Sequence, residues 1–118
     1  VYLYQVMRLT NKKALEKLKK KNRGNVPLSS AIDKLIKDIE DNEWKNQAEL
    51  NKTRPDADCV HSDGFYFFNI NIHRTMVLIE FDDGEASVAW TGTHQEYETT
   101  FKNNKNTIKK WLNSNDWI

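Results

Sequence analysis

Three β-rich segments lie within 27 residues of one another and most constrain what this chain can fold into. The segments Phe65–Ile70, Arg74–Phe81 and Ala86–Thr91 are rich in β-branched and aromatic residues, and short polar stretches separate them. The stretch between the second and third contains Asp83-Gly84, a pair typical of tight hairpins. Strands joined this closely pair antiparallel, so we predict a β-meander at the centre of the fold.

Helical patterns flank this meander in the sequence. Residues 1–9 are typical of a strand, and Thr10 is a plausible N-cap for a lysine-rich helix over roughly 11–22. A second helix is predicted from about Leu28 to Asn42, because five apolar residues recur at helical spacing: Leu28, Ile32, Leu35, Ile36 and Ile39. Another helix begins at about His94, and a C-terminal helix carries Ile108, Trp111 and Leu112. The order predicts an α+β fold with helices on one face of a sheet. In this fold an N-terminal strand and a helical hairpin pack on the antiparallel meander, and a C-terminal helix follows.

Length and composition fit one domain spanning residues 1–118, with 38% apolar and 30% charged residues. Residues 45–64 are polar and turn-rich, and we expect Trp44 and Leu50 to anchor this stretch to the core. Cys59 is the only cysteine, which excludes an internal disulfide and favours a reducing compartment. The sequence shows no long apolar run and no signal peptide, so we expect a cytoplasmic protein without a membrane partner.

The net charge of +1 conceals an asymmetry between the two halves of the chain. Residues 1–54 hold 13 Lys/Arg and 7 Asp/Glu, whereas residues 55–118 hold 5 and 10. The basic half includes Lys12, Lys13, Lys17, Lys19, Lys20, Lys21 and Arg23. Such a cluster can bind phosphate backbones, although a solvated helix face is the simpler interpretation.

The stretch WTGTHQEYE, residues 90–98, combines a helix start with reactive side chains. Thr93 and Glu96 have the spacing of a capping box, and Gly92 would permit a sharp exit from the preceding strand. His94 and Tyr97 lie three residues apart, on one side of the first turn, beside backbone N–H groups that can bind an anion. Histidine can move a proton near neutral pH. A surface histidine and a packed tyrosine remain the alternative.

A second polar cluster occurs in FFNINIHRT. Along an unbroken strand, Asn69, Asn71 and His73 would share a face with Phe65 and Phe67. The alternative is a hairpin turn at residues 71–73, which asparagine favours. The arginine at 74 could bind a phosphate through two parallel hydrogen bonds or pair with the acid at 80.

Other chemistries find no support in the sequence. Its three histidines, His61, His73 and His94, have no compact metal-ligand spacing, and there is no Cys-x-x-Cys. Phosphate-binding glycine loops and the Gly-x-Ser-x-Gly nucleophile motif are also missing. We therefore expect no metal and no cofactor.

Taken in order, these motifs resemble the HigB toxins of type II toxin–antitoxin modules, members of the RelE/ParE superfamily. The resemblance runs from about Trp44 to Tyr97 and rests on Trp44-Lys45-Asn46, Leu50, Pro55–Asp58, Phe68-Asn69-Ile70, Arg74 and Gly92–Tyr97. One departure is the short interval between Phe68-Asn69-Ile70 and Arg74, where residues 71–73 replace an expected glycine-containing turn. The other is the tail at 102–118, with four further lysines and with Trp111, Trp117 and Ile118, which suggest that it is docked.

The resemblance implies a RelE-like fold and a metal-independent mRNA endoribonuclease that cuts in the ribosomal A site by 2′-hydroxyl attack. It implies that His94 is the acid or base, that Arg74 stabilises charge, and that Tyr97 orients the phosphate or stacks on a base. It further implies that Asn69 and His73 line the site and that the basic helix grips ribosomal RNA through Lys12, Lys13, Lys17 and Lys20. The implied partner is a HigA-like antitoxin with a helix-turn-helix domain. The alternatives are a ParE-like toxin that binds its target, for example gyrase, without cutting RNA, or a decayed toxin.

Overall fold

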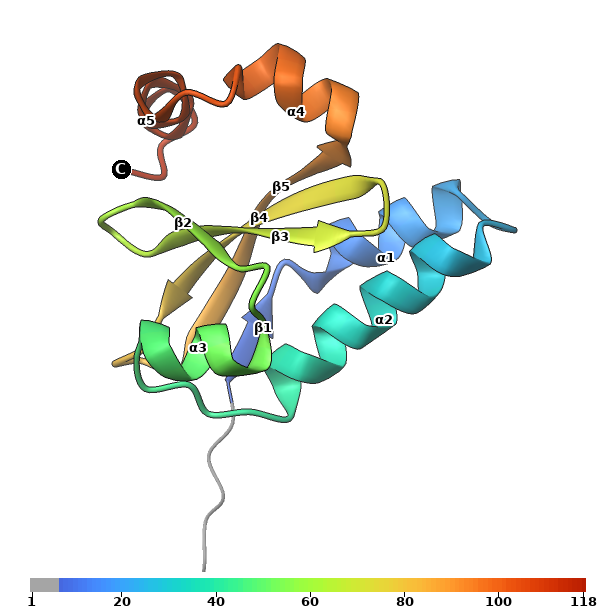
Figure 1. Cartoon of the computed structure of the whole chain (residues 1–118), viewed down its shortest axis with the longest axis horizontal. Helices are drawn as coiled ribbons and strands as arrows, with labels where there is room; N and C mark the ends of the chain where they lie inside the picture. The colour runs from blue at the N-terminus through green and yellow to red at the C-terminus, as the bar shows by residue number, and fades with distance from the viewer. Residues whose placement is uncertain (1–6) are drawn as a thin grey trace, which may run out of the picture.

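A five-stranded mixed sheet forms the centre of the protein (Figure 1). The computed structural model describes residues 7–118, and the strand order is β1-β5-β4-β3-β2. The strands are β1 (Arg8–Thr10), β2 (Asp58–His61), β3 (Phe65–Ile70), β4 (His73–Glu80) and β5 (Glu85–Thr93). The predicted antiparallel meander is confirmed as β3-β4-β5, and β1 joins it parallel to β5. Residues 1–6 of the predicted first strand lie outside the described residues.

Helices cover both faces of this sheet, which corrects the prediction of one covered face (Figure 1). They are α1 (Lys12–Lys21), α2 (Val26–Glu40), α3 (Gln47–Thr53), α4 (His94–Phe101) and α5 (Lys105–Ser114). The reason lies in β3, whose first four residues are all buried rather than alternating between buried and exposed. A strand that is apolar on both faces needs cover on both. Among these helices, none has the length and apolar character to cross a bilayer.

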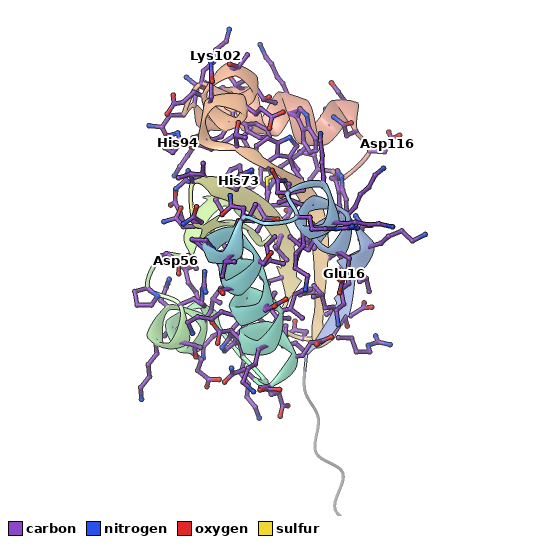
Figure 2. All side chains as sticks on the ribbon, turned by 90° about the vertical axis from the view of Figure 1, so that its right-hand side faces the viewer. Glu16, Asp56, His73, His94, Lys102 and Asp116 are labelled. Carbon is purple, nitrogen blue, oxygen red and sulfur yellow. The ribbon has the colours of Figure 1, made fainter. Side chains whose placement is uncertain are left out.

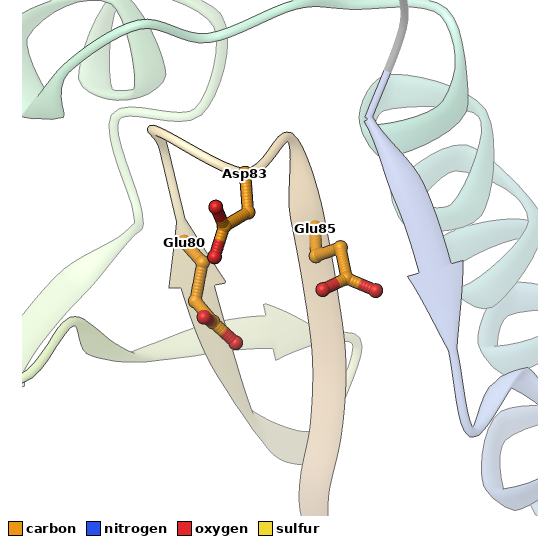
Figure 3. A group of neighbouring side chains, drawn as sticks. All are labelled: Glu80, Asp83 and Glu85. Atoms are coloured by element: carbon orange, nitrogen blue, oxygen red, sulfur yellow. The ribbon is translucent and has the colours of Figure 1, made fainter.

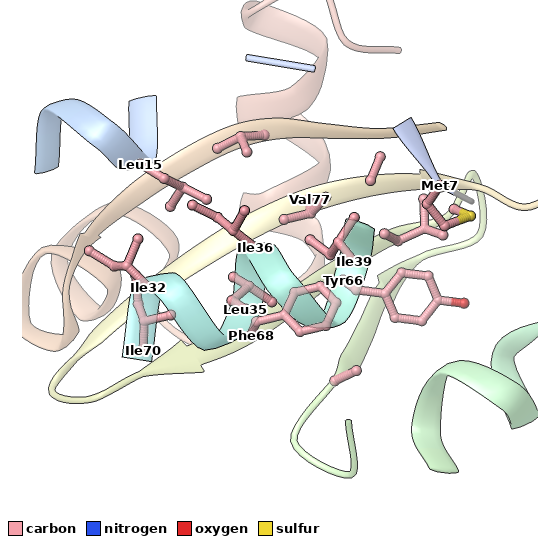
Figure 4. Packing of buried hydrophobic residues seen from close by; sticks show 14 of the residues in the cluster. Met7, Leu15, Ile32, Leu35, Ile36, Ile39, Tyr66, Phe68, Ile70 and Val77 are labelled. Carbon is pink, nitrogen blue, oxygen red and sulfur yellow. The ribbon is translucent and has the colours of Figure 1, made fainter. Parts of the chain in front are cut away.

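The larger core lies between the sheet and the α1–α2 hairpin (Figure 4). The five apolar residues predicted on one face of α2 are all buried, at 8% exposure or less. They pack against sheet residues that include Tyr66, Phe68, Ile70, Val77 and Ile79. The helix begins at Val26, two residues earlier than predicted, because the Asn25 side chain accepts from the Leu28 amide.

The smaller core lies on the opposite face, beneath α4 and α5. It joins Phe65, Phe67 and Met76 of the sheet to buried residues of these two helices: Tyr97, Phe101, Ile108 and Leu112. The tail is docked as predicted through its tryptophans, because Trp117 meets Phe65 edge-on at 6.1 Å between ring centroids. Trp111 contacts Phe101 in the same way, at 5.5 Å, whereas Ile118 is exposed.

Two local predictions were wrong. Thr10 does not cap α1: it ends β1, and Asn11 occupies the cap position with φ 58° and donates its side-chain amide to the Val88 carbonyl. The stretch 45–64 is not all loop, because it contains α3 and β2. The Asn46 side chain caps α3 by accepting from Glu49 N at 2.9 Å. Trp44 and Leu50 are buried, as predicted.

Candidate functional site

The β3–β4 hairpin decides which polar side chains meet. Its connection is only Asn71-Ile72, with Ile70 opposite His73 and Asn69 opposite Arg74. Asn71 adopts φ 63°, the left-handed conformation for which a glycine was expected. The chain therefore turns at 71–72, and the interpretation of 65–73 as one unbroken strand is wrong.

As a consequence of this turn, Arg74 shares a face of the sheet with Asn69, and His73 lies on the opposite face. Arg74 shares a face with Met76 and the smaller core, whereas His73 shares a face with Val77 and the larger core. The predicted group of site residues is thus divided between the two faces of the sheet. Asn69 and Arg74 lie on the face that α4 covers, and His73 lies on the face that the α1–α2 helical hairpin covers. Figure 2 shows His73 and His94 at this end of the molecule.

The Arg74 guanidinium is fixed by two neighbours. Its Nε donates to Asn69 Oδ1 at 3.1 Å, and its Cζ lies 4.5 Å from the centroid of the Tyr97 ring. Phe67 adds a second aromatic contact at 5.5 Å. The part of the chain that the structure describes offers no acceptor to either Nη atom. Arg74 is therefore a held cation with its bidentate edge free, and the ion pairs among residues 7–118 do not include one between Arg74 and Glu80.

Tyr97 supports this arginine with its ring rather than its hydroxyl. Only 2% of the residue is exposed. Its hydroxyl lies 3.0 Å from Asn103 Oδ1, to which it donates. The ring also meets Phe67 edge-on at 4.9 Å. The hydroxyl is thus engaged within the protein, while the ring face lies under the guanidinium.

His94 lies beside the same ring and is open to solvent. Its side chain is 63% exposed, and the His94 and Tyr97 ring centroids are 5.8 Å apart. Its Nδ1 lies 3.8 Å from Glu98 Oε1. His94 and Arg74 therefore flank one aromatic ring, which places a titratable group and a fixed cation on the same surface.

The predicted capping box of α4 is confirmed. Glu96 N donates to Thr93 Oγ1 at 3.0 Å, and Thr93 N donates to the Glu96 carboxylate at 2.8 Å. This backbone hydrogen bond is the main reason that the pKa of Glu96 is lowered. His94 N donates to the Ile72 carbonyl at 3.0 Å. The amides of Thr93, His94 and Glu96 are thus engaged within the protein, which leaves fewer donors for the anion expected at this helix N-terminus.

Gly92 is required for space rather than for a sharp turn. A Cβ added here would lie 2.7 Å from Trp90 Cζ2 and 3.0 Å from Glu96 Oε1. Its φ lies outside the left-handed region, so its backbone conformation needs no glycine. The glycine lets the Trp90 ring and the capping carboxylate close over the end of β5.

His73 is buried, with the Glu96 carboxylate nearby. It is 5% exposed, and its Nδ1 has no hydrogen-bond partner among the described residues. Burial lowers the pKa of His73, and the nearby Glu96 carboxylate opposes this shift without cancelling it. The neutral imidazole is therefore the favoured form in the folded protein.

The lysines predicted to bind RNA lie on α1, across the sheet from Arg74. Lys12 forms an ion pair with Glu40 at 3.4 Å. The other three, Lys13, Lys17 and Lys20, line an open groove of about 730 Å³ at the α1–α2 turn, together with Glu16, Lys19, Arg23, Gly24 and Ser29. Their side chains form a separate basic surface rather than part of the Arg74 cluster.

Three acids at the β4–β5 turn are close enough together to hold a cation (Figure 3). Ligand atoms of Glu80, Asp83 and Glu85 lie within 4.8 Å of one another. Desolvation, followed by the effect of Asp83, raises the pKa of Glu80. Arg8 already contacts Glu85 at 3.1 Å. The cluster lies at the other end of β4 from Arg74, so it adds nothing to the site there.

Sequence reasoning missed the residues that hold the site from behind. Asn103 engages the Tyr97 hydroxyl, and Arg54 and Asp56 contact the backbone of Asn69. The available signal was an arginine and an aspartate two residues apart in an otherwise polar stretch.

The fold and this surface define an α+β protein that presents a fixed arginine and an exposed histidine beside a buried tyrosine. A family model for HigB toxins, the RelE-like toxic component of a toxin–antitoxin system, matches residues 28–100. No curated protein matches the chain. Because the matched region covers more than half of the chain, this protein belongs to the HigB family of RelE-like toxins. Membership implies an antitoxin partner.

Proposed function

We propose that this toxin is a metal-independent endoribonuclease that cuts mRNA on the ribosome. The observation that carries the proposal is the Arg74 guanidinium, which Asn69 and Tyr97 hold while both Nη atoms stay free. A planar fork of this kind matches two oxygens of a phosphodiester. A cation fixed before the substrate arrives stabilises developing charge without reorganisation.

His94 supplies proton transfer in this proposal. The 2′-oxygen attacks the adjacent phosphorus and loses its proton, and the bond from phosphorus to the 5′-oxygen breaks as that oxygen gains a proton. The products are a 2′,3′-cyclic phosphate and a 5′-hydroxyl. An imidazole can carry one of these protons near neutral pH. Tyr97 acts by positioning Arg74, because its hydroxyl is engaged by Asn103.

The proposed nuclease function also implies the partners of the protein. The antitoxin is a HigA-like protein with a helix-turn-helix domain, and the toxin acts in the cytoplasm, where ribosomes carry the mRNA substrate. Lys13, Lys17 and Lys20 contact ribosomal RNA through the open α1 surface, and Lys12 contributes when it leaves Glu40. Asn69 borders the substrate, whereas buried His73 supports the hairpin rather than touching RNA.

The test uses purified toxin, ribosomes and an mRNA carrying a 2′-O-methyl group at the cut nucleotide. We expect the unmodified message to yield a 2′,3′-cyclic phosphate and the modified message to resist. Arg74→Lys should cut about a hundredfold more slowly, since it loses the fork and the stacking contact. Arg8→Lys, at the far end of the sheet, is the matched control and should cut normally.

Cleavage of the 2′-O-methyl message, or an Arg74→Lys variant as fast as the control, would contradict this mechanism. Growth arrest by a toxin that cuts no message would favour the ParE-like alternative, in which the protein binds its target without chemistry. An inert toxin that still binds its antitoxin would favour the decayed alternative.

A further inference from the structure

Asn69 lies in β3 beyond the first residue of β2, so no strand pairs with the outer edge of β3 at this position. The β2–β3 register pairs Asp58 with Phe67 and would place Asp56 opposite Asn69. The strand does not extend that far, so both backbone groups of Asn69 would face outward without a strand to bind.

Two side chains replace the missing strand. Asn69 N donates to Asp56 Oδ2 at 2.9 Å, and Arg54 Nη2 donates to the Asn69 carbonyl at 3.1 Å. The same Arg54 nitrogen contacts Asp56 Oδ2 at 2.7 Å. Arg54, Asp56 and the backbone of Asn69 therefore form a closed set of three contacts, which fixes the backbone at Asn69.

Arg54 is itself buried and anchored on the other side. It is 7% exposed, its Nη1 lies 3.2 Å from Asp38 Oδ2, and its Cζ lies 5.6 Å from the Phe68 ring centroid. Burying such a cation is a poor way to gain stability, because desolvation offsets the attraction. The contacts of Arg54 instead fix the position of the Asn69 backbone.

The clamped residue is the one that aims Arg74. Because the backbone groups of Asn69 point outward, Asn69 and Arg74 form the closer, non-hydrogen-bonded kind of cross-strand pair. The Asn69 side chain therefore reaches Arg74 Nε directly. We propose that Arg54 and Asp56 are positioning residues, which set the direction of the Arg74 guanidinium through Asn69. This inference rests on the proposed nuclease function and extends it to residues that never touch RNA.

The experiment compares Asp56→Ala with Asp38→Ala. Each removes one carboxylate from Arg54, but only Asp56 contacts Asn69, so Asp38→Ala is the matched control. The first readout is the Arg74 Nε–H signal by nuclear magnetic resonance and its exchange with solvent. The second is cleavage of ribosome-bound mRNA, with kcat and KM measured separately.

We expect Asp56→Ala to lose the protected Nε–H signal and at least tenfold in kcat, with KM little changed. Asp38→Ala removes an anchor of Arg54 but leaves both hydrogen bonds to the Asn69 backbone, so it should keep the signal and lose clearly less in kcat. Asp56→Asn, which retains an acceptor oxygen, should recover much of the loss. If Asp56→Ala fails to fold, Asp56→Asn and Asp38→Asn give the same comparison with smaller effects.

An unchanged Arg74 signal in folded Asp56→Ala would overturn the positioning role, whatever the cutting rate. Equal losses in the two alanine variants would also overturn it, since they would indicate a merely structural network. If the wild-type protein cuts no RNA, the nuclease proposal fails, and the magnetic resonance comparison still decides whether Asp56 orients Arg74.

Discussion

Arg74 is held by side chains from two other elements of the fold. Tyr97 arrives from the next helix, and Asn69 from the preceding strand, and both must be in place before the guanidinium has a fixed direction. A lysine at this position would keep the charge but would lose the planar surface that stacks on the ring and the fork that faces outward. The direction of the guanidinium therefore depends on a set of contacts rather than on one side chain.

His73 should make the protein acid-sensitive. Its pKa is lower in the folded state than in the unfolded chain, so the unfolded state takes up a proton first as the pH falls. Stability is unaffected above about pH 6.5, the ordinary histidine pKa, and decreases from there down to the lower folded pKa. Urea unfolding between pH 7.5 and 5 should show this loss in the wild type, and His73→Gln should flatten it. An equally steep loss in His73→Gln would assign the acid sensitivity to another group.

Residue roles were predictable where they depend on local spacing. The Thr93–Glu96 capping box needs only three residues of helix and was confirmed. The face occupied by His73 was not predictable in the same way, because it depends on whether the chain turns at Asn71. A turn at this residue, in place of a continuing strand, puts His73 on the opposite face of the sheet from Asn69.

The junction of β5 and α4 is the element on which the proposed site depends. It carries the capping box, the hydrogen bond from His94 N to the Ile72 carbonyl, and the Trp90 ring packed over Gly92. These contacts fix the helix start to both the strand before it and the hairpin beside it. The orientation of His94 follows from them.

Gly92→Ala should destabilise the protein by about 1–3 kcal/mol, the usual cost of overpacking. The added methyl would meet Trp90 Cζ2 at 2.7 Å, so the cost should fall when Trp90 is first replaced by leucine. Urea unfolding of the two single variants and the double variant measures this coupling. Strictly additive costs would show that something other than the tryptophan requires the glycine.

Long periodic elements were predictable, and short ones were not. Helix α2 shows five apolar residues at helical spacing, and β3 is an apolar run with clear ends. Helix α3 has one buried residue, Leu50, and β2 has four residues at the sheet edge, so neither produces a periodic signal. The second covered face was missed because an all-apolar strand shows no alternation to count.

Over the whole molecule, the basic α1 surface and the proposed site lie on different faces of the sheet. The open lysines of α1 gather at the α1–α2 turn, whereas Arg74 and His94 lie on the α4 side of the sheet. The proposed ribosome-dependent nuclease would use both surfaces, the lysines to bind ribosomal RNA and the Arg74 side to bind the message.

Replacing Lys13, Lys17 and Lys20 by glutamine should weaken ribosome binding in a salt-dependent way. Each lost phosphate contact lowers the slope of log affinity against log salt by roughly 0.7 to 0.9. The matched control replaces three other exposed lysines, Lys34, Lys37 and Lys52, two of which already pair with aspartates. Titration with ribosomes at several salt concentrations compares the two triple variants. Equal slopes in both would place the binding surface elsewhere.

The proposed reaction is the cutting of translated mRNA, with His94 transferring a proton. The most direct measurement induces the wild-type chain and His94→Ala from a tight promoter and maps the 5′ ends of cellular mRNA. We expect new 5′ ends within translated frames for the wild type and their loss in the variant, since proton transfer contributes a factor of about 10² to 10⁴. Wild-type growth arrest without new ends would contradict the nuclease activity, and an unchanged set of cuts in folded His94→Ala would contradict the role of His94.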